Sequence, residues 1–273
     1  MRPKIVATGL YVPPKVETAA ELAPRVGRSE EWILKHTGVA QRHISEEPME
    51  VMGANAARQA LGEGPEPDLL INASTTPRQL IPDSSAFILR ELGMEEIPSH
   101  SVHATCLSFL VAIHAAAAYI MSGAYRRVLV VSSEVGSVSR DFSEPESAVL
   151  IGDAAAAAVM EPTPDGEDST LLAYEMATWP KGAELTELRG AGIRCHPNDP
   201  SVTPADNLFH MDGPAVYKMA RHRAAVVLRR VFRKVGLGPE DVKLIVPHQA
   251  SGPALAAIPS YGFAADSVVN IIG

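Results

Sequence analysis

Cysteine is scarce in this sequence, which has only Cys106 and Cys195 among 273 residues. Two cysteines cannot make a disulfide framework for a chain of this length. Neither belongs to a Cys-x-x-Cys pair or to a Cys/His array with the spacing of a zinc site. Both are therefore predicted to be free thiols, and no metal site is expected.

Positive charge and long apolar runs are also in short supply. There are 24 Lys and Arg residues against 32 Asp and Glu, a net charge of −8, which argues against partners such as nucleic acid or an anionic membrane surface. The apolar stretch near the N-terminus is too short for a signal peptide, and no window holds the ~18 uninterrupted apolar residues of a membrane span. We expect a cytoplasmic protein without nucleic-acid or membrane contacts.

The hydrophobic residues, 46% of the chain, are arranged in two alternating patterns. Longer stretches with helical spacing, such as residues 51–61 and 214–235, alternate with short apolar runs rich in strand-forming residues. These runs are KIVATG, DLLINAS, RVLVVSSE, AAAAVME and VKLIVPH. The alternation predicts an α/β protein with a layered, largely buried sheet.

The polar, turn-rich segment TPDGEDST, residues 163–170, is the predicted boundary between two halves, residues 1–162 and 171–273. Each half contains a helical stretch, a Gly-Pro-Glu turn, an acidic residue and an apolar run that ends in small polar residues. Internal duplication would explain this, although helix, turn and strand also recur by chance in α/β proteins. The matching register places His248 just past a strand end, where ligand sites gather in such folds.

Cys106 stands at the start of a long apolar stretch, in HATCLSFL. Residues 106–121 predict a buried helix, and Gly123 suits the position just after it. Free amide N–H groups and the helix dipole would favour a thiolate in the first turn. Cys106 can thus be a nucleophile or a small buried apolar residue, and position alone leaves both open.

A nucleophilic cysteine needs a partner, and His248 is the histidine best placed for that role. It follows an apolar run in LIVPHQAS, where Pro247 stiffens the turn. On spacing alone, the alternative is that His248 is a packing residue.

Motifs spread over nearly the whole chain resemble those of β-ketoacyl-acyl-carrier-protein synthase III, a condensing enzyme of the thiolase fold. They are IVATGLYVP, SEEWILKHTGVAQRHI, TTPRQLIPDSSA, ATCLSF, SGAYRRVLVVSSE, LIGDAAAAAVMEP, FHMDGPAVYKMA and VPHQAS. The resemblance implies two similar halves in an α-β-α-β-α layered architecture. It also implies a homodimer whose first-half sheets join.

In that family the cysteine heading the buried helix takes an acyl group from a thioester, a role that falls on Cys106. The histidine of the Pro-His-Gln-Ala stretch, here His248, assists decarboxylation of a malonyl carrier protein and stabilises the enolate oxygen. The enolate carbon then attacks the acyl-cysteine. The resemblance implies acyl carrier protein as a partner and no metal or redox cofactor.

The match fails at the C-terminal end, since family members also use an asparagine in a Gly-Asn motif and a glycine-rich loop. Neither is present before the sequence stops at Gly273, and Asn270 does not follow a glycine. Ending after the run VVNII would leave an unfinished sheet with an exposed apolar edge. We therefore expect a second half that is incomplete at its C-terminus.

Several further positions are assigned to the substrate by the resemblance. The family often binds coenzyme A with an arginine four residues after the tryptophan equivalent to Trp32; this position is His36, which favours a carrier-protein donor over coenzyme A. Ile81 replaces an aromatic that limits the acyl pocket across the dimer, so a longer or branched chain could fit. The remaining substrate-binding residues expected are Tyr217, Ala250 and Ser251.

The helical stretch 214–235 carries a concentration of basic residues on one side. In an acidic protein such a patch suits an acidic partner, and acyl carrier proteins are acidic. The residues predicted to dock the carrier protein are Lys218, Arg221, Arg229 and Arg233, with an ordinary solvated face as the alternative.

Two other functions compete with condensation. An acyltransferase of the same fold could pass the acyl group to a hydroxyl or an amine, and a degenerate subunit could pair with an active synthase. Intact Cys106 and His248 argue against the degenerate subunit.

Overall fold

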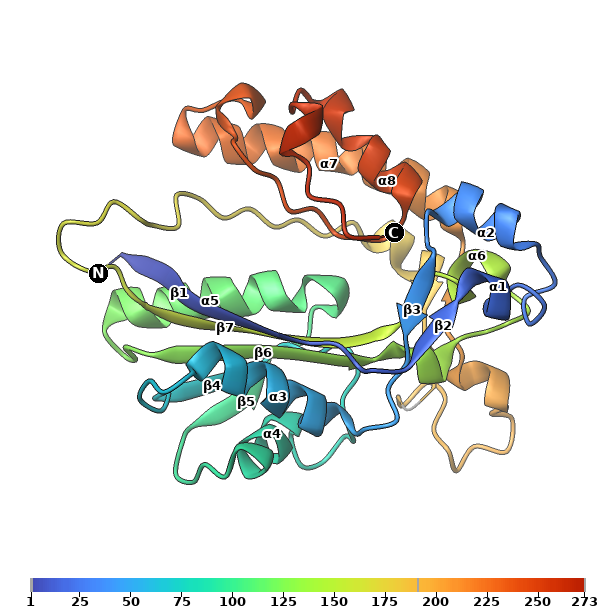
Figure 1. Cartoon of the computed structure of the whole chain (residues 1–273), viewed down its shortest axis with the longest axis horizontal. Coiled ribbons are helices and arrows are strands. Elements are labelled where there is room, and N and C mark those ends of the chain that lie inside the picture. The colour runs from blue at the N-terminus through green and yellow to red at the C-terminus, as the bar shows by residue number, and fades with distance from the viewer. Residues whose placement is uncertain (1, 191, 273) are drawn as a thin grey trace. The chain divides into compact units, whose positions relative to one another are not determined.

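The structure is a computed structural model that describes residues 2–190 and 192–272. The chain divides into two compact units (Figure 1). Unit 1 comprises residues 1–15, 43–136 and 152–172, and unit 2 comprises residues 16–42, 137–151 and 173–273. The predicted halves at residues 1–162 and 171–273 stay a prediction, because compactness alone does not test an internal repeat.

Unit 1 is built on a five-stranded sheet with the order β1-β7-β6-β4-β5. Strand β4 runs parallel to β5 and to β6, whereas β7 runs antiparallel to both β6 and β1. The strands are β1 (Pro3–Tyr11), β4 (Leu69–Asn72), β5 (Ser99–Ser101), β6 (Val128–Val135) and β7 (Asp153–Pro162). The helices are α3 (Met49–Leu61), α4 (Ser84–Leu92) and α5 (Ser108–Ser122).

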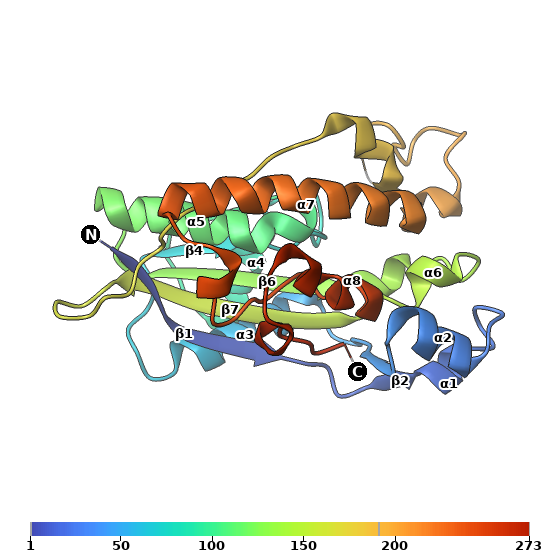
Figure 2. The same ribbon diagram turned by 90° about the horizontal axis from the view of Figure 1, so that it is seen from above.

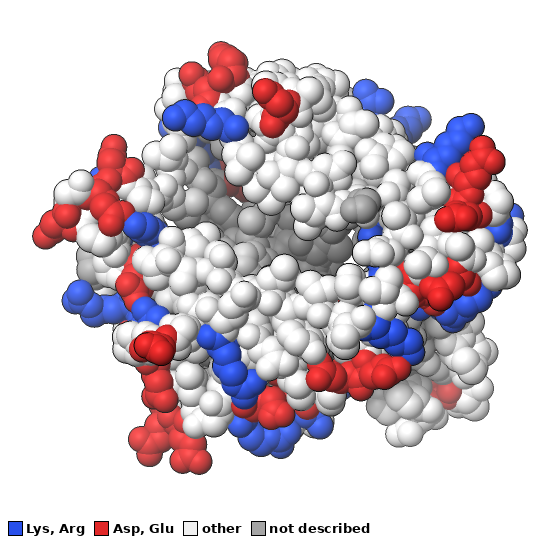
Figure 3. Space-filling view, viewed as in Figure 1, with Lys and Arg blue, Asp and Glu red and all other residues white. Residues whose placement is uncertain are grey.

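Helices cover both faces of this sheet, which explains why its central strands are almost entirely apolar. On one face, α3 and α4 pack on side chains such as Leu70, Leu129 and Val131. On the other face, α5 packs on Leu69 and Val130. The predicted strands within β1, β4, β6 and β7 are confirmed, as is the helix of residues 51–61. In Figure 3 acidic and basic side chains are interspersed over α3 and α4.

Helix α5 lies along β6 and β7 (Figure 2). Its buried side consists of small residues and one isoleucine, Ala112, Ala116, Ala117 and Ile120, which let the helix approach the sheet closely. Gly123 ends it in the left-handed conformation, with φ of 77°, as predicted. By length and composition Thr105–Ser122 could cross a membrane, a possibility that the sequence analysis missed; the core helix of a soluble protein passes the same test. The expectation of no membrane contact stays a prediction.

Unit 2 is mainly helical, with one long helix, α7 (Gly213–Val235). Its shorter elements are β2 (Val16–Thr18), α1 (Ala19–Leu22), α2 (Glu30–Thr37), β3 (Gln41–His43), α6 (Pro145–Ala148), β8 (Thr186–Glu187), β9 (His210–Met211) and α8 (Gly252–Ala256). One apolar cluster joins α1, α2 and α6 around Ile33 and Val149. A second joins Val39, Leu255 and Ile272.

The predicted strand VKLIVPH is wrong as a regular strand. Only Ile245 forms a β-bridge there, parallel to Val268, through hydrogen bonds with the backbone of Ser267 and Val269. An isolated pair of strands is only marginally stable, because neither strand has a second neighbouring strand to hydrogen-bond with. His248 therefore follows a short extended segment and not a sheet strand.

Candidate active site

Three neighbouring strand ends of unit 1 carry polar residues toward the same edge of the sheet. Strand β4 leads to Thr75, β5 leads to Cys106, and β6 ends near Glu134. Because β4 is parallel to both β5 and β6, these three carboxyl ends meet. This edge is where side chains gather for ligand binding in α/β sheets.

A chain of hydrogen bonds ties the three strand ends together. The backbone N–H of Ser133 donates to Ser74 Oγ at 2.9 Å, and that hydroxyl donates to Asn72 Oδ1 at 2.7 Å. Asn72 Nδ2 in turn donates to Ser101 Oγ at 2.8 Å. Ser74 and Asn72 are buried, so these bonds satisfy polar groups that water does not reach. The edge is consequently a fixed platform.

Cys106 lies in a 3₁₀ turn, Thr105–Leu107, that precedes α5. The expectation that it belongs to the first α-helical turn is therefore wrong by one short turn. Thr105 has a φ of 50°, in the left-handed region that β-branched residues rarely adopt. The Ser108 hydroxyl accepts from the N–H of Ala104 at 2.9 Å and donates to the Thr105 carbonyl at 2.7 Å, which holds this conformation. Backbone held in such a region is typical of functional turns.

The Cys106 thiol is exposed, but its ionisation differs from the expected one. Desolvation by the surrounding protein raises the pKa of Cys106, and the charge of Glu134 raises it further, against a lowering by the residue's own backbone N–H. The backbone N–H lowers the pKa of Cys106 as predicted, but desolvation outweighs it, so the predicted net lowering is wrong. Because Cys106 lies in the 3₁₀ turn before α5, it is one turn further from the N-terminus of the α-helix than predicted, where the helix dipole acts more weakly.

Glu134 is a residue that the sequence analysis did not single out. Its carboxylate accepts hydrogen bonds from the backbone N–H groups of Thr75 and, at 3.3 Å, Thr76. Desolvation nevertheless raises the pKa of Glu134. The signal was present in RVLVVSSE, where a carboxylate closes an otherwise apolar strand.

His248 lies in unit 2, in a loop held by the next residue, Gln249. Gln249 Nε2 donates to the carbonyl oxygens of Pro247 at 3.0 Å and Val269 at 3.1 Å, and its Oε1 accepts from the N–H of Ile271 at 3.1 Å. His248 retains an exposed surface, yet desolvation lowers its pKa. The lowered pKa favours the neutral imidazole, in which one ring nitrogen carries a proton to donate and the other can accept.

Trp32 and His36 form a stacked pair on α2. Their ring centroids are 4.6 Å apart, with planes inclined by 21°, and the guanidinium of Arg28 lies 5.2 Å from the Trp32 ring. Position 36 thus holds a ring that stacks on the tryptophan where the family often has an arginine.

The other predicted substrate-binding residues are distributed over several elements. Ile81 is 85% exposed in the segment before α4, within unit 1. In unit 2, Tyr217 is on α7, whereas Ala250 and Ser251 share the His248 loop. Ser251 Oγ accepts from the N–H of Ala254 at 3.4 Å and so caps α8. Substrate contact by these four residues stays a prediction.

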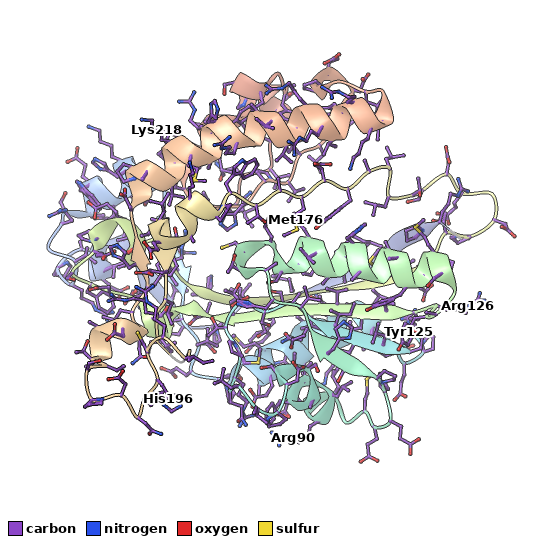
Figure 4. All side chains as sticks on the ribbon, turned by 180° about the vertical axis from the view of Figure 1, so that it is seen from behind. Arg90, Tyr125, Arg126, Met176, His196 and Lys218 are labelled. Carbon is purple, nitrogen blue, oxygen red and sulfur yellow. The ribbon has the colours of Figure 1, made fainter. Side chains whose placement is uncertain are left out.

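The basic residues of α7 divide into two groups. Arg230 and Lys234 form ion pairs with Glu175, and Arg223 stacks over Trp179. The four predicted docking residues are exposed and follow one another at spacings of three, eight and four residues, which places them on one side of the helix. They are Lys218, Arg221, Arg229 and Arg233. Figure 4 labels Lys218 near the N-terminal end of α7. No residue of α7 is fully buried, so its apolar side packs less completely than expected.

Among residues 2–190 and 192–272, no group of three or more His, Cys, Asp and Glu side chains is arranged to hold a metal ion. The chemistry available at the described strand edge is that of a thiol, a carboxylate, hydroxyl and amide side chains and backbone N–H groups.

Comparison with known proteins agrees with this geometry. Residues 101–180, which include Cys106, match the family model of 3-oxoacyl-[acyl-carrier-protein (ACP)] synthase III. The chain is 35% identical to the β-ketoacyl-[acyl-carrier-protein] synthase III of Sphingopyxis alaskensis, with 96% of this chain and 81% of that protein covered. The corresponding enzyme of Chlamydia muridarum is 31% identical over 94% of this chain and 80% of its own length.

Solved structures give the same result. The 3-oxoacyl-[acyl-carrier-protein] synthase III of Aquifex aeolicus is similar with a TM-score of 0.87 and 30% identity, over 99% of this chain and 84% of that one. The priming β-ketosynthase of the R1128 polyketide pathway has a TM-score of 0.87 and 27% identity, over 99% of this chain and 81% of its own. The predicted thiolase-like α/β fold is confirmed. The chain belongs to the β-ketoacyl-acyl-carrier-protein synthase III family of condensing acyltransferases.

Proposed function

We propose that this protein transfers an acyl group from a thioester to Cys106 and then condenses it, with decarboxylation, with a malonyl group on acyl carrier protein. The observation that carries the proposal is the exposed thiol of Cys106 on a held turn at the edge of the sheet. Covalent attachment divides the condensation into two easier steps. The chemistry uses thioesters alone and requires no metal or redox cofactor.

In this proposal His248 acts in the second step. A neutral imidazole can donate its N–H to the enolate oxygen that forms as carbon dioxide leaves, and a donor already in place stabilises that charge without reorganisation. The lowered pKa of His248 supports the neutral form. The Gln249 bonds support a fixed position for the loop.

Sequential addition of substrates tests this function. The full chain is incubated with acyl-carrier-protein thioesters, the adduct is located on Cys106 by intact mass and peptide mapping, and malonyl carrier protein is then added. We expect an acyl adduct that disappears with release of carbon dioxide and appearance of a β-ketoacyl thioester. Absence of an adduct with every thioester would overturn the proposal, and discharge without carbon dioxide would favour transfer to another acceptor.

The donor is proposed to be carrier-protein-bound acyl thioester, and not coenzyme A. Phosphates of a nucleotide are held best by the bidentate guanidinium of arginine. At position 36 the chain has an imidazole that stacks on Trp32, which supports weak recognition of those phosphates. A homodimer, with Ile81 reaching the partner's acyl pocket, is also part of the proposal.

We place the carrier-protein docking surface on the exposed basic side of α7, formed by Lys218, Arg221, Arg229 and Arg233. The whole chain has a net charge of −8, so this concentration of positive charge is local and complements an acidic partner. A cavity of about 400 Å³ borders Arg229 and is lined by apolar side chains that include Leu228 and Phe232. It offers a place for an apolar side chain of the partner beside the charged contacts.

Reversing Arg229 and Arg233 to glutamate is expected to weaken carrier-protein binding about tenfold at low salt, since repulsion replaces attraction. Titration of labelled carrier protein at two salt concentrations measures the effect. The control reverses Arg90 and Arg126, which are exposed in unit 1 and labelled in Figure 4, and so makes the same change in net charge. Equal affinities for the two double variants would contradict docking on α7.

A further inference from the structure

Glu134 is connected to the turn that presents Cys106 by a short path of hydrogen bonds. Its carboxylate holds the backbone N–H groups of Thr75 and Thr76. Thr75 Oγ1 then donates to the carbonyl oxygen of Thr105 at 3.3 Å, one residue before the cysteine. All of these groups belong to unit 1, at the carboxyl ends of β4, β5 and β6. The carboxylate is therefore fixed relative to the thiol.

The partners of Glu134 are all neutral. Besides the two N–H groups, the carboxylate interacts with the hydroxyls of Thr75 and, at 3.5 Å, Ser132. The effects on the pKa of Glu134 are desolvation and these neutral donors. The pKa of Cys106 is raised by desolvation, lowered by its own backbone N–H and raised by the charge of Glu134. None of these unit 1 partners carries a positive charge.

We propose that Glu134 is a positioning residue that also keeps Cys106 in its neutral thiol form in the resting enzyme. Two negative charges in a partly desolvated site repel each other, so the carboxylate disfavours the thiolate. A neutral thiol reacts slowly with oxidants and alkylating agents. Glu134 thus protects the nucleophile until substrate arrives.

The same charge favours the acylated enzyme over the thiolate, an effect that rests on the proposed function. On acyl transfer, the bond between the acyl carbon and the donor sulfur breaks and a bond to Cys106 Sγ forms. The thiol proton ends on the departing thiol. The product on Cys106 is a neutral thioester, which Glu134 does not repel.

The test measures the rate of alkylation of Cys106 by iodoacetamide from neutral to alkaline pH, followed by peptide mapping to separate it from Cys195. In Glu134→Gln the carboxylate charge is lost while size is kept. We expect the midpoint of the pH profile to move to lower pH and the rate at pH 7 to rise about three- to tenfold. A midpoint that is unchanged or moves to higher pH would overturn the inference.

Two control variants separate charge from position. Thr75→Val removes the hydroxyl that bonds to Thr105 and also contacts Glu134, but it keeps the carboxylate, so its midpoint should stay close to that of the wild type even if its rate differs. Glu95→Gln makes the same charge change on the N-terminal side of β5, whereas Cys106 follows the C-terminal end of that strand. It should alter neither the midpoint nor the rate. A midpoint shift in either control as large as that of Glu134→Gln would contradict a specific role of Glu134.

Circular dichroism checks folding, and if Glu134→Gln does not fold, Glu134→Asn takes its place because a shorter amide leaves room for a water at the Thr75 and Thr76 N–H groups. The probe is iodoacetamide and not an acyl thioester. A protein that forms no acyl adduct but shows the Glu134-dependent midpoint would therefore overturn the proposed function alone.

Discussion

Cys106→Ala is expected to abolish the acyl adduct and to lower the rate of condensation by at least about a thousandfold. The reason is that the proposed reaction passes through a covalent intermediate, and removal of a nucleophile eliminates that route and leaves only the stabilisation that the rest of the site supplies. Intact mass measures the adduct, and release of labelled carbon dioxide from malonyl carrier protein measures condensation.

Cys195→Ser is the matched control for this variant. Cys195 is the second thiol of the chain, is only half exposed and lies in unit 2, with its Sγ 3.8 Å from Asp206 Oδ1. A serine retains a hydrogen-bond donor there, so adduct and activity should persist. An adduct that survives in Cys106→Ala and is lost in Cys195→Ser would assign the acyl group to the other cysteine.

His248→Ala is expected to separate the two steps. Condensation should fall about 10²- to 10³-fold, the usual cost of removing one donor to a developing oxyanion, while acylation of Cys106 persists. The acyl-enzyme should therefore accumulate in the presence of malonyl carrier protein. Stopped reactions analysed by intact mass give the amount of acyl-enzyme, and carbon dioxide release gives the second step.

His196→Ala provides the control, because His196 is another exposed histidine of unit 2, labelled in Figure 4. It should retain both steps. Loss of acylation together with condensation in His248→Ala would show that His248 is needed to activate the thiol, and would contradict a role limited to the enolate.

The sequence predicted the elements of unit 1 well, because each depends on local patterns. The runs DLLINAS and RVLVVSSE are apolar throughout, as strands covered on both faces must be, and they form β4 and β6. The prediction for VKLIVPH failed because an apolar run becomes a strand only where neighbours extend the pairing, and here only Ile245 pairs.

The site was predictable in part. Cys106 could be located from the change of polarity in HATCLSFL, and the family motifs around it assigned its expected role. Glu134 could not be assigned in that way, since it is 28 residues further along the chain and its relation to the thiol arises from the strand order β6-β4-β5. The left-handed conformation of Thr105 was likewise hidden, because threonine does not favour it.

By itself the sequence determined that the chain is an α/β protein of the synthase III family with a thiol at the start of its most apolar helix. Periodicity, turn residues and motifs are local properties, so they can be read without coordinates. The direction in which the pKa of Cys106 shifts was decided only by the tertiary structure. That direction depends on desolvation and on a carboxylate from β6, and folding brings both to the thiol from distant parts of the chain.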